Sequence, residues 1–129
     1  MDHDTAESLI ESYVGGWRDG DRARIFGTLD EGCMIVESYG PVYRGAERVG
    51  QWIDKWFGEG NTVDGWEVTS FFVGDSRAAF EWRFECTYHG ERAAFEGASV
   101  VEFSGGKIAR LREYCTTGDL YEWEGEWRS

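Results

Sequence analysis

The chain has 129 residues, with 13 Lys or Arg against 25 Asp or Glu and a formal net charge of −12. Because the basic residues are few and form no cluster, nucleic acids and anionic membranes are poor partners, and we expect neither. A hydrophobic fraction of 41% and seven tryptophans instead predict a folded globule, and the length suits a single domain over residues 1–129.

The cysteines and the absence of several motifs indicate the cellular compartment and the kinds of ligand to expect. The three cysteines, Cys33, Cys86 and Cys115, are widely spaced and odd in number, so we expect reduced thiols in a cytoplasmic protein. We find no signal-peptide pattern over residues 1–10 and no apolar run near the length of a membrane span. No spacing resembles a metal site or a phosphate-binding loop, so we expect no metal and no cofactor.

The first half of the chain predicts three helices and one strand. Apolar residues recur at helical spacing from Asp4 to the glycine at position 20. A second, shorter helix is expected from Asp21 through Leu29, followed by a strand over Cys33–Tyr39 that ends at a Gly-Pro break. A third helix is expected from Gly45 to a glycine at position 58 or 60.

The second half predicts four strands. They cover Trp66–Val73, Ala79–Tyr88, Glu91–Phe103 and Lys107–Cys115, and turn signals that contain glycine separate them. Residues 116–129 mix aromatic and acidic side chains, and their pattern predicts no element. Helices segregated from an antiparallel sheet give an α+β fold.

The strand Ala79–Tyr88 raises the question of which face is buried. Alternate side chains point to opposite faces, so Trp82 and Phe84 share one face while Arg83 and Glu85 share the other. Composition alone favours a buried apolar face and a solvated face that carries cross-strand ion pairs. A two-residue turn after this strand would place Arg83 opposite Glu96, whereas a three-residue turn would place Glu85 opposite Phe95.

Several segments together resemble the SnoaL-like branch of the nuclear transport factor 2-like (NTF2-like) superfamily. They are the opening helix, the stretch Glu37–Gly45 before the third helix, the strand Phe95–Val101, and the Gly106–Tyr114 segment. The resemblance implies a cystatin-like cone, in which a strongly curved, mostly antiparallel sheet wraps around N-terminal helices. It also implies a conical pocket for a small apolar ligand and a homodimer that forms through the outer sheet face.

A sharper resemblance is to limonene-epoxide-hydrolase-like members, which carry Arg-x-Asp on a central strand and Trp-Arg-Asp-Tyr on the last. Arg83-Phe84-Glu85 and Leu111-Arg112-Glu113-Tyr114 occupy the corresponding places. The resemblance implies that Glu85 and Glu113 are an acid/base pair bridged by Arg83, with Glu37 on the first strand as a third acid. On this basis we expect these residues to line the pocket.

The remaining expectations concern substrate contacts, assembly and function. The residues expected to contact the substrate are Tyr13, Trp17, Trp52, Trp56, Phe95 and Leu111. The residues expected to form the dimer interface are Trp82, Phe84, Val100 and Tyr114. The function implied is cofactor-independent acid/base chemistry (a hydrolase, isomerase, cyclase or dehydratase) on an apolar metabolite. The alternative is a module of the same fold that binds a hydrophobic ligand, or an interacting protein, without catalysis.

Overall fold

The computed structural model describes residues 1–128, and the chain begins with two helices. Helix α1 spans His3–Asp19 and helix α2 spans Arg22–Phe26. The side chain of Asp2 accepts a hydrogen bond from the backbone N–H of Thr5, which satisfies one of the free donors at the start of α1. Gly20 ends α1 with a left-handed backbone (φ 64°), as the sequence predicts.

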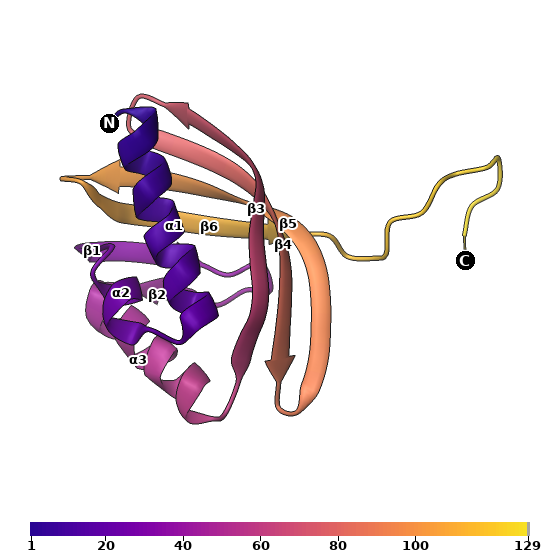
Figure 1. Ribbon diagram of the computed structural model, residues 1–129, viewed down its shortest axis with the longest axis horizontal. Coiled ribbons are helices and arrows are strands. Elements are labelled where there is room, and N and C mark those ends of the chain that lie inside the picture. Colours follow the sequence, from indigo (N-terminus) through magenta and orange to yellow (C-terminus); the bar gives the residue numbers. More distant parts are fainter. Residues whose placement is uncertain (129) are drawn as a thin grey trace.

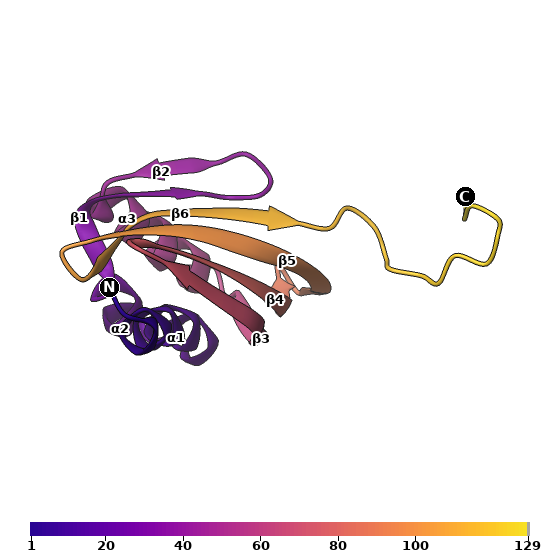
Figure 2. The same cartoon turned by 90° about the horizontal axis from the view of Figure 1, so that it is seen from above.

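Six strands form one sheet on which the helices pack. They are β1 (Leu29–Val36), β2 (Val42–Arg44), β3 (Thr62–Gly74), β4 (Arg77–Tyr88), β5 (Glu91–Ser104) and β6 (Lys107–Cys115), in the spatial order β2-β1-β6-β5-β4-β3. Every neighbouring pair is antiparallel except β1 and β6, which are parallel. The long strands β3, β4 and β5 curve strongly, and α1 and α3 (Ala46–Gly58) lie on the same side of the sheet (Figures 1 and 2). The expected α+β cone is confirmed.

Several boundaries in the first half differ from the sequence prediction. Helix α2 ends at Phe26 rather than Leu29, because Leu29 pairs with Ile108 and begins β1. The first strand therefore spans Leu29–Val36 rather than Cys33–Tyr39. The short strand β2, which the sequence did not predict, follows the Gly-Pro break and pairs with Met34–Val36. A three-residue strand is too short to show an alternating pattern.

The turn between β4 and β5 decides the register of the central strands. It contains two residues, His89 and Gly90, which both have positive φ (49° and 82°), as two-residue hairpins of this kind require. The backbone N–H of His89 also donates to Oδ1 of the buried Asn61 over 2.8 Å. Arg83 therefore pairs with Glu96, which is the first of the two registers considered above.

A register irregularity in β6 changes which side chains are buried. Phe103 pairs with Ile108, but Glu102 pairs with Arg110, so Ala109 is an extra residue on β6. Ile108 and Leu111 are consequently both fully buried. Strict alternation along Lys107–Cys115 would place these two side chains on opposite faces, so the extra residue is what lets both be buried.

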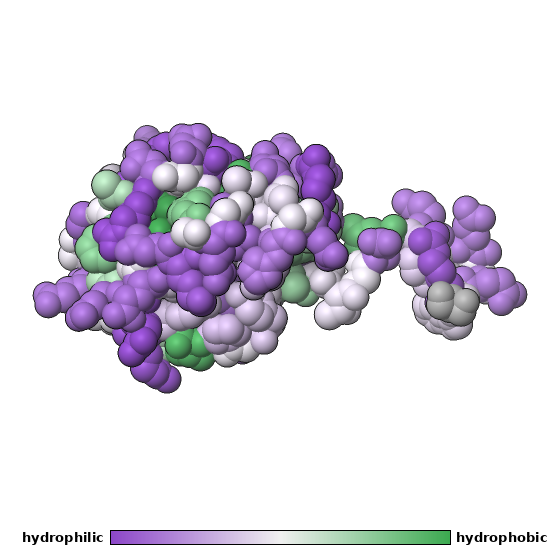
Figure 3. All heavy atoms as spheres, turned by 90° about the horizontal axis from the view of Figure 1, so that it is seen from below, coloured by the Kyte–Doolittle hydropathy of each residue, from purple (hydrophilic) through white to green (hydrophobic). Residues whose placement is uncertain are grey.

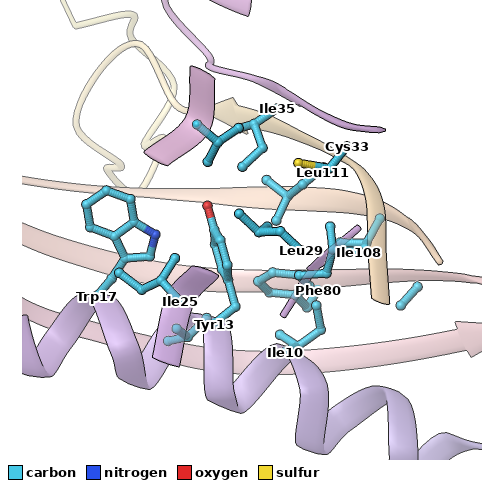
Figure 4. Packing of buried hydrophobic residues seen from close by; sticks show 14 of the residues in the cluster. Ile10, Tyr13, Trp17, Ile25, Leu29, Cys33, Ile35, Phe80, Ile108 and Leu111 are labelled. Atoms are coloured by element: carbon cyan, nitrogen blue, oxygen red, sulfur yellow. The ribbon is translucent and has the colours of Figure 1, made fainter. Parts of the chain in front are cut away.

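The hydrophobic core lies between α1 and the sheet. Figure 4 shows Ile10 and Tyr13 of α1 packed toward Leu29, Phe80 and Ile108. These side chains are almost completely buried, and this burial fixes α1 across the sheet.

Residues 116–128 extend away from the rest of the chain (Figures 1–3). Within this segment the rings of Trp123 and Trp127 lie 5.3 Å apart, and the Arg128 guanidinium lies 4.2 Å from the Tyr121 ring centre. The surface of the molecule that Figure 3 shows is mostly hydrophilic, in keeping with the net charge of −12. Among the described residues, no helix is both long and apolar enough to cross a bilayer.

Candidate active site

A cavity of about 320 Å³ opens between α1, α3 and the curved part of the sheet. Ten of its sixteen lining residues are aromatic, and five of these are tryptophans. The lining residues are Tyr13, Trp17, Glu37, Ser38, Tyr39, Trp52, Trp56, Val63, Trp66, Trp82, Phe84, Cys86, Tyr88, Ala93, Phe95 and Glu113. Glu37 and Glu113 are the only acids among them, and no Lys, Arg or His lines the cavity.

The two acids are brought together by the parallel pairing of β1 and β6. Ile35 pairs with Leu111 and both side chains are fully buried. Two residues further along each strand, side chains return to the same face, so Glu37 and Glu113 face the cavity side by side. Glu37 lies one residue beyond the end of β1, and its backbone N–H donates to the carbonyl of Pro41 over 2.9 Å.

Burial raises the pKa of both carboxyls, and the charge of Glu37 adds to the effect on Glu113. Burial raises the pKa of Glu37 from 4.5 to about 7. The pKa of Glu113 lies well above its ordinary value, first because of burial and then because of the nearby charge of Glu37. Neither carboxyl forms an ion pair within residues 1–128. The pair therefore carries at most one negative charge near neutral pH.

Tyr13 supplies a hydroxyl near this pair. Its ring is fully buried, and its oxygen has no hydrogen-bond partner among the described residues. Figure 4 shows the phenol oxygen directed away from α1, toward the strand that carries Ile35. Burial, followed by the charge of Glu113, raises the pKa of Tyr13 well above its usual value, so the phenol stays protonated and can donate.

Two indole N–H groups are also buried without partners. They belong to Trp17 and Trp66, whose rings flank Tyr13 at centroid distances of 6.5 and 6.0 Å. A buried polar group without a partner costs about 1–3 kcal/mol. Three such donors around one cavity are free to bind a ligand or water.

Tyrosines also surround the outer part of the cavity. Tyr39 is 71% exposed and lies two residues after Glu37. Burial raises the pKa of the half-buried Tyr43, which stacks on Trp52 of the cavity wall, and the charge of Glu37 acts in the same direction. These phenols remain neutral at physiological pH.

A close backbone approach supports the aromatic wall. Trp82 lies against Gly97 of β5, and a Cβ atom at position 97 would come within 2.6 Å of the indole ring and would also meet the carbonyl of Tyr114. The indole nitrogen of Trp82 donates to Oγ of the buried Ser99 over 2.9 Å. Gly97 is therefore needed for Trp82 to line the cavity.

The prediction that Arg83 and Glu85 lie in the pocket with Glu113 is wrong. Both belong to the outer face of β4, where the Arg83 side chain is 67% exposed. Nε of Arg83 donates to Glu96 over 3.2 Å, and Arg92 donates to Glu85 over 3.3 Å. Alternation explains the difference, because Phe84 points into the cavity and its neighbours in sequence must point out.

Some of the residues predicted to contact the substrate or to form the dimer interface line the cavity, and the others lie outside it. Tyr13, Trp17, Trp52, Trp56 and Phe95 line the cavity, whereas Leu111 is fully buried in the core and does not. Trp82 and Phe84 point into the cavity, so they cannot form an outer interface. Val100 and Tyr114 are on the exposed side.

The sequence prediction missed part of the cavity wall. Trp66, Tyr39 and Tyr88 line it, and none of them was expected to contact a substrate. The aromatic character of Trp66–Val73 indicated only a strand, and the position of Tyr39 depends on the loop between β1 and β2. Over residues 1–128, no three His, Cys, Asp or Glu side chains converge as a metal site requires.

The fold is shared with solved structures of low sequence identity. An epoxide hydrolase of M. tuberculosis, described as LEH-like, superposes with a TM-score of 0.79 at 15% identity, over 88% of this chain and 84% of the other. A Bacillus subtilis protein provisionally named an isomerase gives 0.78 at 17% identity, over 90% of both chains. A protein of unknown function with a cystatin-like fold from Methylobium petroleophilum PM1 gives 0.74 at 20% identity, over 99% of this chain and 84% of the other.

Sequence comparison identifies the family. No curated protein matches the chain. Residues 10–111, most of the chain, match the family described as the SnoaL-like domain. The chain therefore belongs to the SnoaL-like domain family, within the NTF2-like fold.

Proposed function

We propose that the protein is a cofactor-independent enzyme that moves a proton to or from a carbon next to the carbonyl group of a mostly apolar metabolite. One observation carries the proposal: two neighbouring, half-buried carboxyls with raised pKa values share an aromatic cavity with an unpartnered phenol. Environments that separate the pKa values of two acids commonly define one base and one acid.

The proposal divides the roles between the two acids. Glu37, with a pKa of about 7, is the general base, because it ionises at neutral pH yet is basic enough to take a proton from carbon. Glu113, whose pKa is raised by burial and by the charge of Glu37, is the partner that keeps its proton and donates a hydrogen bond, as does the hydroxyl of Tyr13. Together these two donors would stabilise the negative charge that develops on the carbonyl oxygen.

The cavity walls support the same chemistry. Aromatic side chains exclude water, and low local polarity strengthens each hydrogen bond to a developing oxyanion. The same walls select an apolar substrate body. Hydrolysis by a carboxylate–arginine–carboxylate set is not proposed, because Arg83 lies outside the cavity.

The test does not require the natural substrate. Apolar ketones with exchangeable α-protons, such as 2-tetralone and 1-indanone, are incubated in D₂O with the protein, and NMR follows deuterium incorporation. We expect exchange faster than in buffer alone, and loss of the acceleration in Glu37→Gln. Glu85→Gln is the matched control, because it removes a carboxylate outside the cavity.

A non-catalytic ligand-binding module is the competing function. The ten aromatic residues of the lining favour it, since they provide affinity without chemistry. Ketones that raise the melting temperature but gain no exchange would support the binder and overturn the enzyme.

We also propose a homodimer through the outer sheet face. Phe72, Val100 and Tyr114 are exposed there, at 63%, 37% and 49%. Phe72 and Val100 both pair with Ala79, so their side chains lie in one row across three strands. A second copy would cover this apolar row.

A further inference from the structure

The charged side chains that line the cavity are acidic, without a basic partner among the described residues. Among the described residues that line it, the acids are Glu37 and Glu113, which share one negative charge near neutral pH, and none is Lys, Arg or His. Elsewhere in the described chain, ion pairs with Arg, Lys or His side chains are common; they include those of Glu11, Asp54 and Glu96. The negative charge of the cavity pair is thus left without a counter-charge from residues 1–128.

The other titratable groups near Glu37 and Glu113 supply no positive charge to balance them. They are Tyr13 on α1, Cys33 on β1, Tyr39 in the loop after β1, Tyr43 on β2, and Tyr88 and Cys86 on β4. All are phenols or thiols, and none can supply a positive charge. A ligand is therefore the remaining source of a cation.

The aromatic walls of the cavity also favour a positively charged ligand. The face of an indole or phenol ring is electrostatically negative and attracts ammonium groups, and tryptophan does so most strongly. Five of the seven tryptophans line this cavity. The net charge of −12 adds a field that steers cations toward the protein.

We propose that the cavity selects ligands that carry a positively charged nitrogen, of the tertiary or quaternary ammonium class, over neutral and anionic ligands of the same shape. This deepens the proposed function by naming the charge of the ligand. It rests on that function only in treating this cavity as the functional site.

Three probes of one shape test the selection. Phenyltrimethylammonium is a cation, tert-butylbenzene is its neutral isostere, and benzenesulfonate is an anion of similar size. Binding is measured at pH 8.0 in 0.15 M salt, where long-range surface attraction is largely screened. The readouts are isothermal titration calorimetry and quenching of tryptophan fluorescence. We expect the cation to bind at least about tenfold more tightly than the isostere, consistent with a cation–π contact and one ion pair, and the anion not to bind.

The pH dependence provides a second readout. A cation favours the ionised pair, so binding near pH 7 should release protons, and affinity should rise as pH increases from 6 to 8. Calorimetry in phosphate and in Tris measures the released protons, because the two buffers differ in ionisation enthalpy. The neutral isostere should show neither effect.

Variants connect the selection to the pair. Glu37→Gln should weaken cation binding while leaving the isostere bound, which also shows that the variant is folded. Glu85→Gln removes a carboxylate from the outer face and should change the binding of neither ligand. Equal affinities for cation and isostere, or a preference that survives in Glu37→Gln, would overturn the proposal. Ketone exchange is measured separately, so either proposal can fail without the other.

Discussion

Glu37, just after β1, and Glu113 on the parallel strand β6 line the same cavity, and no basic side chain among the described cavity-lining residues separates them. Burial and the charge of Glu37 hold the pKa of Glu113 above that of an ordinary carboxyl, while burial raises the pKa of Glu37 to about 7. Because the two strands are far apart in the sequence, the pair exists only in the folded chain. Its properties lead to the following predictions.

The two acids should respond unequally to substitution. Glu37→Gln removes the base and should lower ketone exchange by at least about 100-fold. Glu113→Gln replaces one hydrogen-bond donor by another and should cost only about tenfold. Exchange rates of both variants at pH 8.0 check this. Equal losses would mean that the roles of the two acids are not distinct.

The rate of exchange should follow the ionisation of the base. Since the pKa of Glu37 is about 7, the rate constant should rise about tenfold per pH unit below pH 7 and level off above it. NMR-detected exchange between pH 5.5 and 8.5 measures the profile. A rate independent of pH would exclude Glu37 as the base.

Much of the fold, but only part of the site, could be predicted from the sequence. Side-chain patterns and turn signals predicted three helices and five of the six strands, and only the three-residue strand β2 escaped them. The alternation of Trp82, Arg83, Phe84 and Glu85 also predicted two faces, and composition correctly favoured the apolar face as buried. The resemblance to an Arg-x-Asp motif indicated the opposite, and a shift of one residue exchanges the two faces.

The pairing of Glu37 with Glu113 could not be predicted from the sequence, because it depends on how two distant strands align. Glu113 was expected in the pocket and lines it, but its expected partner was Glu85 rather than Glu37. The true neighbour is set by the parallel register of β1 and β6. No turn connects these strands, so no local signal fixes their register.

Tyr13→Phe should separate stability from function. The hydroxyl of Tyr13 is buried without a partner, so its removal should not lower the free energy of unfolding, and should raise it by up to about 1–3 kcal/mol. Ketone exchange should nevertheless fall, because one oxyanion donor is lost. Urea unfolding and NMR exchange on the same preparation check both parts. A clear loss of stability would indicate a hydrogen bond within the fold.

The outer face yields a prediction about assembly. Val100→Lys should favour monomers, because it places a charge in the exposed apolar row next to Ala79. Sedimentation velocity at micromolar concentration should show a dimer for the unsubstituted protein and a monomer for the variant. Thr69→Lys, an exposed position on β3 outside this row, is the control. A monomer without any substitution would contradict the interface.

The acid pair should also make stability depend on pH. Burial raises the pKa of Glu37 from 4.5 to about 7, so between these values the native state binds more protons than the unfolded state. Stability is therefore lost as pH rises through this window, by about 3 kcal/mol for a shift of this size. Glu37→Gln cannot ionise, so it should be more stable than the unsubstituted protein at pH 8.0 by up to about this amount. At pH 5.0 the two should differ little. Urea unfolding at both values measures the difference, with Glu85→Gln as the exposed control. An equal gain at both pH values would contradict the raised pKa.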